Sequence, residues 1–112
     1  MCLFCKIASK EIPSKVVFED DELFAFHDVN PGAPTHVLVV PKRHVVGIGH
    51  VEAEDGALLG KLLLAARRVA EATGIADGGY RVVFNNGPNA GQSVFHLHMH
   101  VLGGRALAWP PG

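Results

Sequence analysis

Cysteine is scarce in this sequence, with only Cys2 and Cys5 among 112 residues. Two thiols this close in the chain do not make the disulfide framework of a secreted protein. Their C-x-x-C spacing suits a metal site or a redox site better. We therefore expect a fold whose stability does not depend on disulfides.

The chain also lacks an excess of charge and a long hydrophobic run. Ten basic and eleven acidic residues leave a formal net charge of -1, and no Lys/Arg cluster follows a helical or groove-tracking pattern. We therefore expect neither a long nucleic acid nor an anionic membrane as partner, and any bound nucleotide should be small. No run approaches the ~18 apolar residues of a membrane span, and no signal-like segment opens the chain, so the cytoplasm is the expected location.

The apolar residues that are present suffice for one packed core. With 48% hydrophobic residues in 112, a single domain over 1–112 is expected. Apolar residues at helical spacing predict one long helix from about Glu52 to Thr73, ended by Gly74. Runs rich in β-branched and aromatic residues predict five strands, at 16–19, 23–26, 36–40, 80–84 and 95–102. Together they predict an α+β domain, an antiparallel sheet backed by the long helix.

The last of these runs, FHLHMHVL at 95–102, contains three of the seven histidines at alternate positions. In a strand His96, His98 and His100 would point to one side, where the imidazoles line a surface, and the apolar residues between them would enter the core. A solvated face that happens to carry histidine is the plain alternative. It explains three histidines in register poorly, because histidine is rare on surfaces without chemistry.

Two functional interpretations of the histidine run remain. An H-x-H pair on a strand can chelate zinc. Alternatively, one imidazole serves as nucleophile or base while its neighbours orient it and bind charge. The preceding loop, residues 85–93, favours the second interpretation, because its glycines, amides and hydroxyl can direct hydrogen-bond donors at an anion such as phosphate.

The histidine run matches the H-φ-H-φ-H-φ-φ signature of the histidine triad (HIT) superfamily. The segment GQSV at 91–94 and the C-terminal WPPG at 109–112 resemble its nucleotide-binding Hint branch. Further similar segments occur along the chain, at 4–7, 11–13, 26–28, 33–36 and 41–44. The resemblance implies a single HIT domain over 1–112, with a short N-terminal helix in addition to the long one.

The activity that this resemblance implies is hydrolysis of purine nucleoside 5′-phosphoramidates. The typical reaction converts adenosine 5′-monophosphoramidate to AMP and an amine through a nucleotidyl-histidine. His98 is the expected nucleophile, and the carbonyl of His96 would hold its other ring nitrogen as a donor. His36 matches the fourth, orienting histidine of the family, and Ser93 would pass a proton to the amine. No metal is needed for this reaction.

The substrate contacts follow from the same resemblance. Asp28 matches the ribose-binding carboxylate, although a turn-initiating residue has a structural role as well. His100 is expected on the phosphate, as are residues of the loop: Asn85, Gly91, Gln92 and Ser93. The base would occupy an apolar slot formed by Leu3, Phe4, Ile7, Phe26, Val29 and Leu38, any of which could instead fill the core. Because such a slot offers no polar contact to the base edge, adenine and guanine should both fit.

The resemblance also implies a homodimer that pairs through the long helix and the 80–84 strand. In that dimer Trp109 would approach the partner's substrate site and help select the leaving group. Some bacterial relatives with the same cysteine pair hold a structural zinc, for which Cys2, Cys5, His44 and His96 are the corresponding ligands. The alternative for the cysteines is two free thiols on a short helical turn.

Functions from other classes stay open at this point. A diadenosine polyphosphate hydrolase is the nearest enzymatic rival, disfavoured by the GQS segment at 91–93 and the WPPG ending. A non-catalytic nucleotide-binding or scaffold protein and a metal-binding module are the others. The physiological amine, the pathway and any protein partner do not follow from the sequence.

Overall fold

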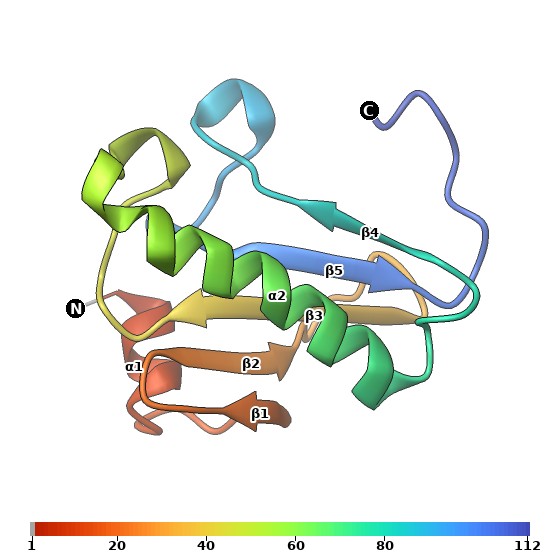
Figure 1. Ribbon diagram of the computed structural model, residues 1–112, viewed down its shortest axis with the longest axis horizontal. Coiled ribbons are helices and arrows are strands. Elements are labelled where there is room, and N and C mark those ends of the chain that lie inside the picture. The colour runs from red at the N-terminus through yellow and green to blue at the C-terminus, as the bar shows by residue number, and fades with distance from the viewer. Residues whose placement is uncertain (1) are drawn as a thin grey trace.

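The fold is an antiparallel sheet with a long helix on one face and a short helix on the other (Figure 1). The computed structural model describes residues 2–112. The five strands lie in the order β1-β2-β3-β5-β4, so that β3 is central. The elements are α1 (Leu3–Ala8), β1 (Val16–Glu19), β2 (Leu23–His27), β3 (Thr35–Pro41), α2 (Gly56–Thr73), β4 (Tyr80–Val83) and β5 (Met99–Gly103). This architecture confirms the predicted α+β class and both helices.

Alternate residues of the same strands pack the two faces of the sheet. Side chains of a strand alternate between its faces, and both faces are covered here, so the central strands are apolar throughout. In β2 and β3 the odd-numbered residues enter the core beneath α2: Leu23, Ala25, Val37 and Val39. The even-numbered residues enter the core beneath α1: Phe24, Phe26, Leu38 and Val40. His100 pairs with Leu38 across β5 and β3, which puts its imidazole on the α1 face.

The long helix begins later than its apolar spacing predicts. It starts at Gly56 rather than near Glu52, because Glu52 and Asp55 form a capping box that closes a separate 3₁₀ turn, Ala53–Asp55. It ends as predicted at Gly74, whose left-handed φ of 78° lets its N–H donate to the carbonyl of Ala70. Among residues 2–112, no helix is both long and apolar enough to cross a bilayer.

The strand predicted over the histidine run is also shorter than expected. Strand β5 begins at Met99, so that His96 and His98 precede it rather than lie within it. The reason is local hydrogen bonding: the N–H of Leu97 donates to the carbonyl of Val45, and the carbonyl of His96 accepts from a side chain. The alternation nevertheless persists, because Leu97 and Met99 enter the core beneath α2.

Strand β4 forms one edge of the sheet and, among residues 2–112, pairs only with β5. Large apolar side chains lie exposed on this strand and on α2: Tyr80 is 37% exposed, Leu63 55% and Leu64 70%. An open strand edge beside exposed leucines is a surface on which another chain can pair.

Gly103, at the end of β5, offers a test of the packing between the sheet and the segment after α2. A Cβ at this position would lie 2.8 Å from Cδ1 and 3.1 Å from Cβ of Ile75, a buried β-branched side chain that cannot move aside cheaply. We expect Gly103→Ala to lower the free energy of unfolding by about 1–3 kcal/mol, measured by urea denaturation. Gly78→Ala is the matched control, because a Cβ there meets no atom within 4 Å, and its stability should equal that of wild type. Equal midpoints for the two variants would contradict the packing described.

Candidate functional site

A cavity of about 400 Å³ lies between α1 and the sheet, beside the histidine run. Its apolar wall contains all six side chains predicted for the base slot: Leu3, Phe4, Ile7, Phe26, Val29 and Leu38. The polar lining residues include Asp28, Ser93, His98 and His100. None of the lining residues, within the part of the chain described, is a lysine or arginine. The cavity therefore combines an apolar slot with a hydrogen-bonding end that carries no fixed positive charge.

His98 is oriented by the backbone of the run itself. Its Nδ1–H donates to the carbonyl of His96 over 2.7 Å. A nitrogen that faces a carbonyl must carry the proton, so Nε2 carries the lone pair. Burial lowers the pKa of His98, although the His96 carbonyl and the carboxylate of Asp28 oppose this shift. At neutral pH the ring is therefore an uncharged base with a defined tautomer.

A second chain of hydrogen bonds sets the proton positions of His36 and His100. The N–H of Gly32 donates to Nδ1 of His36 over 2.9 Å, which places the proton of His36 on Nε2. That Nε2–H donates to Nδ1 of His100 over 2.8 Å, so His100 carries its proton on Nε2. Nε2 of His100 is buried and has no partner among the described residues. An unpaired buried donor that borders a cavity is suited to bind an acceptor of a ligand.

Burial keeps these two imidazoles uncharged. Desolvation lowers the pKa of His36, opposed by the carboxylate of Asp28, whose Oδ2 lies 3.5 Å from Nε2. It lowers the pKa of His100 to about 4, and the neighbouring His98 and His36 add to the shift. The expectation that the three imidazoles of the run line a surface is wrong for His96, which is fully buried, whereas His98 and His100 line the cavity.

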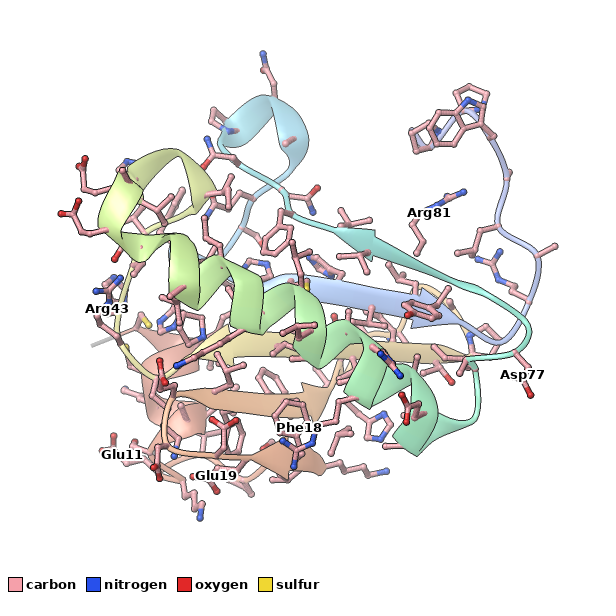
Figure 2. All side chains as sticks on the ribbon, viewed as in Figure 1. Glu11, Phe18, Glu19, Arg43, Asp77 and Arg81 are labelled. Carbon is pink, nitrogen blue, oxygen red and sulfur yellow. The ribbon has the colours of Figure 1, made fainter. Side chains whose placement is uncertain are left out.

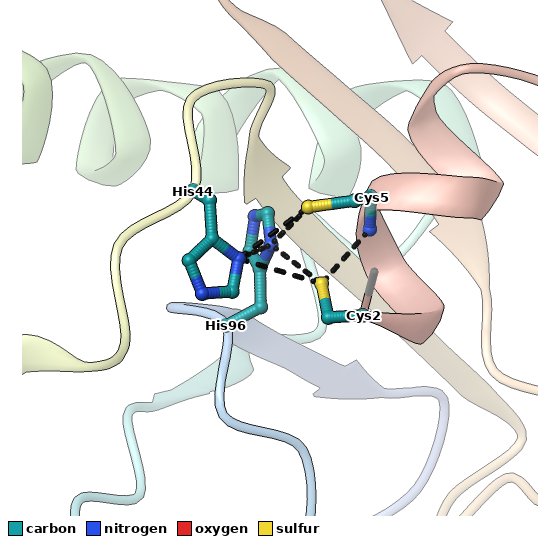
Figure 3. A group of neighbouring side chains, drawn as sticks. All are labelled: Cys2, Cys5, His44 and His96. Atoms are coloured by element: carbon teal, nitrogen blue, oxygen red, sulfur yellow. Dashed lines mark hydrogen bonds between the residues drawn. The ribbon is translucent and has the colours of Figure 1, made fainter.

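His96 turns away from the cavity toward the N-terminal cysteines. Its Nε2–H donates to the carbonyl of Pro41 over 2.7 Å, which leaves the lone pair of Nδ1 facing the thiols. Figure 3 shows Cys2 and Cys5, at the start of α1, with His44 and His96 around one point. From Nδ1 of His96, Sγ of Cys2 lies at 3.2 Å, Sγ of Cys5 at 3.5 Å and Nδ1 of His44 at 3.2 Å.

These four side chains have the composition and spacing of a metal site. A tetrahedral zinc with Zn–S of about 2.3 Å and Zn–N of about 2.0–2.1 Å separates its ligand atoms by roughly 3.3–3.8 Å. The distances in the cluster, including 3.4 Å from Nδ1 of His44 to each sulfur, are close to that range. The predicted ligand set therefore forms a cluster that can hold a metal ion.

Four residues predicted to contact substrate lie outside the cavity lining: Asn85, Gly91, Gln92 and Trp109. The amide of Gln92 is used within the protein, because its Nε2 donates to the carbonyls of Val46 and Val94 and its Oε1 accepts from the N–H of Gly87. Gln92 therefore stabilises the conformation of the 85–93 loop through these hydrogen bonds.

The C-terminal segment lies beside β4, where Arg81 donates to the carbonyl of Ala108 over 3.0 Å. Figure 2 shows the Arg81 side chain directed toward this segment. The guanidinium also lies 5.8 Å from the ring centre of Trp109, which is 79% exposed. Within a single chain, Trp109 does not contribute to the cavity lining.

Several contributors to the site were not predicted from the sequence. The N–H of Gly32 and the carbonyl of Pro41 set the tautomers of two histidines. Every residue has a carbonyl and every residue except proline an N–H, so no sequence signal identifies these two. The remaining unpredicted lining residues are Ile12, Pro13, Ser14, His27, Asn30 and Val94. Four of these six, Ile12, Pro13, His27 and Val94, lie in segments that resemble the family, and this resemblance was the available signal.

Comparison with known proteins identifies the family. Residues 9–107 match the HIT domain. An uncharacterized HIT-like protein of Synechocystis sp. is 54% identical, over 98% of this chain and 96% of that protein. The 14 kDa zinc-binding protein of Zea mays is 51% identical, over 98% of this chain and 87% of that protein. The crystal structure of a HIT family hydrolase from Legionella pneumophila Philadelphia 1 has a TM-score of 0.97 and 51% identity, with both chains fully covered at 100%. The similarities confirm the predicted superfamily and fold.

The depressed pKa of His100 predicts a loss of stability in acid. An unfolded histidine takes up its proton near its ordinary pKa of 6.5, whereas folded His100 does so only near 4. Stability that is present above pH 6.5 is therefore lost as the pH falls toward 4. In metal-stripped protein, we expect this residue to account for about 2 kcal/mol of the unfolding free energy lost between pH 7 and pH 4.5.

Urea denaturation of His100→Gln at the two pH values measures this contribution. The variant should lose less stability than wild type on acidification, because glutamine does not titrate in this range. His50→Gln, at an exposed histidine before α2, is the matched control and should keep the wild-type dependence. An unchanged acid loss in His100→Gln would contradict the lowered pKa of His100.

Proposed function

The chain belongs to the HIT domain family, and we propose that it hydrolyses purine nucleoside 5′-phosphoramidates through a nucleotide covalently attached to His98. The observation that carries this proposal is the fixed tautomer of His98, whose Nδ1–H is held by the His96 carbonyl so that Nε2 carries a free lone pair. A neutral, oriented imidazole in the wall of a nucleotide-sized cavity is suited to nucleophilic attack.

Binding uses the two halves of the cavity. The purine occupies the apolar slot between α1 and the sheet, where Phe4 and Phe26 form an edge-to-face pair with ring centres 5.7 Å apart. Asp28 accepts the ribose hydroxyls; its Oδ1 already accepts from the N–H of Asn30 over 2.9 Å, which holds the carboxylate in place. Because the slot is apolar, either purine fits.

The first chemical step transfers the nucleotide to the protein. Nε2 of His98 attacks phosphorus with its lone pair and the P–N bond to the amine breaks. The amine nitrogen takes a proton from the hydroxyl of Ser93, which receives one from solvent in the same step. The imidazole becomes cationic as the Nε2–P bond forms. The His96 carbonyl stabilises this charge through the Nδ1–H, as does the Asp28 carboxylate.

The second step returns the protein to its starting state. Water attacks phosphorus, the Nε2–P bond breaks and its electron pair returns to His98, and the proton lost by the water passes to solvent. The products of the two steps are AMP and the amine. In both steps the unpaired Nε2–H of His100 donates to a phosphoryl oxygen, and His36 keeps that proton on Nε2 by donating to Nδ1. No step requires a metal.

The cluster of Cys2, Cys5, His44 and His96 is proposed to hold a structural zinc. A bound zinc supplies a cross-link between α1 and the sheet and takes no part in the reaction. The thiol and imidazole ligands, the near-tetrahedral spacing and the Nε2–H of His96 held by a carbonyl all support zinc over harder cations.

The protein is further proposed to work as a homodimer in the cytoplasm. Support for a dimer comes from the open edge of β4 and from the exposed Leu63 and Leu64 on α2. A two-fold axis beside β4 would extend the sheet across both copies and cover this edge. The exposed Trp109 would then be free to approach the partner's cavity.

Replacing His98 tests the covalent mechanism. We expect His98→Ala and His98→Asn to lower kcat by about 10⁴-fold or more, because no other side chain supplies the attacking lone pair. AMP affinity by calorimetry should stay within about threefold of wild type, since the slot and Asp28 are unchanged. Nucleotidyl-protein trapped by acid quench should be present in wild type and in the control His50→Asn, and absent from both variants. Its persistence there, or wild-type protein that binds AMP without turnover, would overturn the proposal.

Replacing Ser93 tests whether its hydroxyl protonates the departing amine. If the hydroxyl protonates the departing amine, Ser93→Ala should slow turnover by about 10- to 100-fold for alkylamine leaving groups and much less for weakly basic arylamines. Ser14→Ala is the matched control, because it removes another hydroxyl from the same cavity and should show no such dependence. A plot of log kcat against amine pKa gives the comparison, and equal slowing across the series counts against the role of Ser93.

Deleting residues 108–112 tests the dimer and the tail together. Light scattering at micromolar concentration should report a dimer for both full-length and truncated protein, since β4 and α2 are intact. The truncation should change the relative rates of different amine substrates by about tenfold while AMP affinity changes little. A fully active monomer would refute both parts of this proposal.

A further inference from the structure

Helix α1 belongs to two sites at once. Cys2 caps the helix and Cys5 lies in its first turn, so both thiols of the metal cluster sit at its start. The residues between and after them, Leu3, Phe4 and Ile7, form part of the apolar wall of the cavity. Figure 3 shows the thiols directed toward two histidines that come from elsewhere in the fold.

This helix depends on its surroundings for its position. It has only six residues, far fewer than the roughly 12–15 that an isolated helix needs to persist in water. The core beneath it takes Phe4, Ile7 and Ala8, while Leu3 is 47% exposed. The thiols are its other attachment: they meet His44, which follows β3, and His96, which precedes β5.

The same helix also contacts the candidate nucleophile. The ring of Phe4 packs edge-on against the ring of His98, with centres 5.0 Å apart and an interplanar angle of 83°. His96 connects the two sites from the other side, because its Nδ1 belongs to the cluster while its carbonyl accepts from His98. The metal cluster and the cavity therefore share one helix and one histidine.

We infer that Cys2 and Cys5 are positioning residues for the nucleotide cavity, and that metal and nucleotide bind cooperatively through α1. A metal ion held by all four ligands fixes the helix against the sheet and closes the apolar slot. Without the ion the helix keeps its apolar contacts and the weaker hydrogen bonds between its thiols and the two imidazoles, so part of its ordering must come from the nucleotide on binding. This inference rests on the proposed function, because it takes a purine nucleotide as the ligand.

Cooperativity of this kind is reciprocal. If the metal raises the affinity for nucleotide by a given factor, the nucleotide raises the affinity for metal by the same factor. A coupling of about tenfold is expected for a short helix ordered in part by each ligand. Because reciprocity holds for any route of coupling, faster hydrogen exchange confined to α1 is the observation that separates coupling through this helix from a general loss of structure.

The experiment compares untagged protein loaded with zinc and protein stripped by EDTA and dialysis. Calorimetry with AMP should give a dissociation constant about tenfold lower for the loaded form. Competition with a chromophoric chelator should show zinc held about tenfold more tightly when AMP is saturating. Adenosine, which lacks the phosphate, should produce the same factor and so exclude direct contact between phosphate and zinc. Amides of α1 should exchange hydrogen faster in the stripped form.

Matched variants complete the test. Cys2→Ser/Cys5→Ser should bind AMP like stripped wild type and no longer respond to zinc. Lys6→Ala, at an exposed position of α1, should keep both affinities. Equal AMP affinity in loaded and stripped wild type, or zinc binding indifferent to AMP, would overturn the coupling while leaving the proposed function intact. Failure of zinc to bind at all would also overturn it, and failure of AMP to bind either form would overturn the proposed function as well.

Discussion

The burial of one histidine is the constraint on which the rest of the site depends. His96 is fully buried, yet its ring nitrogens and its carbonyl all have partners: Pro41, the cysteine cluster and His98. A buried polar group left unpaired costs about 1–3 kcal/mol. Moving any one of these partners away would leave a polar group of His96 unpaired, so His96 holds all of them in place. The end of β3, the N-terminal helix and the candidate nucleophile consequently form one connected unit.

Neutral groups provide most of the electrostatics of the cavity. Low local polarity disfavours charged imidazoles, and the backbone then decides which nitrogen of each neutral ring is the donor. A peptide N–H from Gly32 and a peptide carbonyl from His96 give His100 and His98 opposite roles, one a donor and the other a lone-pair base. The different proton positions of these two imidazoles are therefore set by backbone groups and require no charged neighbour.

The elements that follow from local chemistry were predictable, and those that follow from tertiary hydrogen bonds were not. The alternating strands and the stop at Gly74 depend on side-chain pattern and on backbone freedom, both visible in sequence. The late start of β5 depends on a bond from Leu97 to a distant carbonyl. Likewise the apolar slot was predictable by resemblance, whereas the internal use of the Gln92 amide depends on how the loop folds back onto Val46.

The absence of lysine and arginine from the described cavity lining has a consequence for selectivity in a cell. A phosphoramidate monoester brings little negative charge, which neutral N–H donors can accommodate. A nucleoside triphosphate brings several charges into the same space beside the carboxylate of Asp28, with no lysine or arginine among the described lining residues to offset them. For the proposed function, this lining predicts weaker binding of triphosphates because of their charge rather than their shape, and an affinity for the phosphoramidate that depends only weakly on ionic strength.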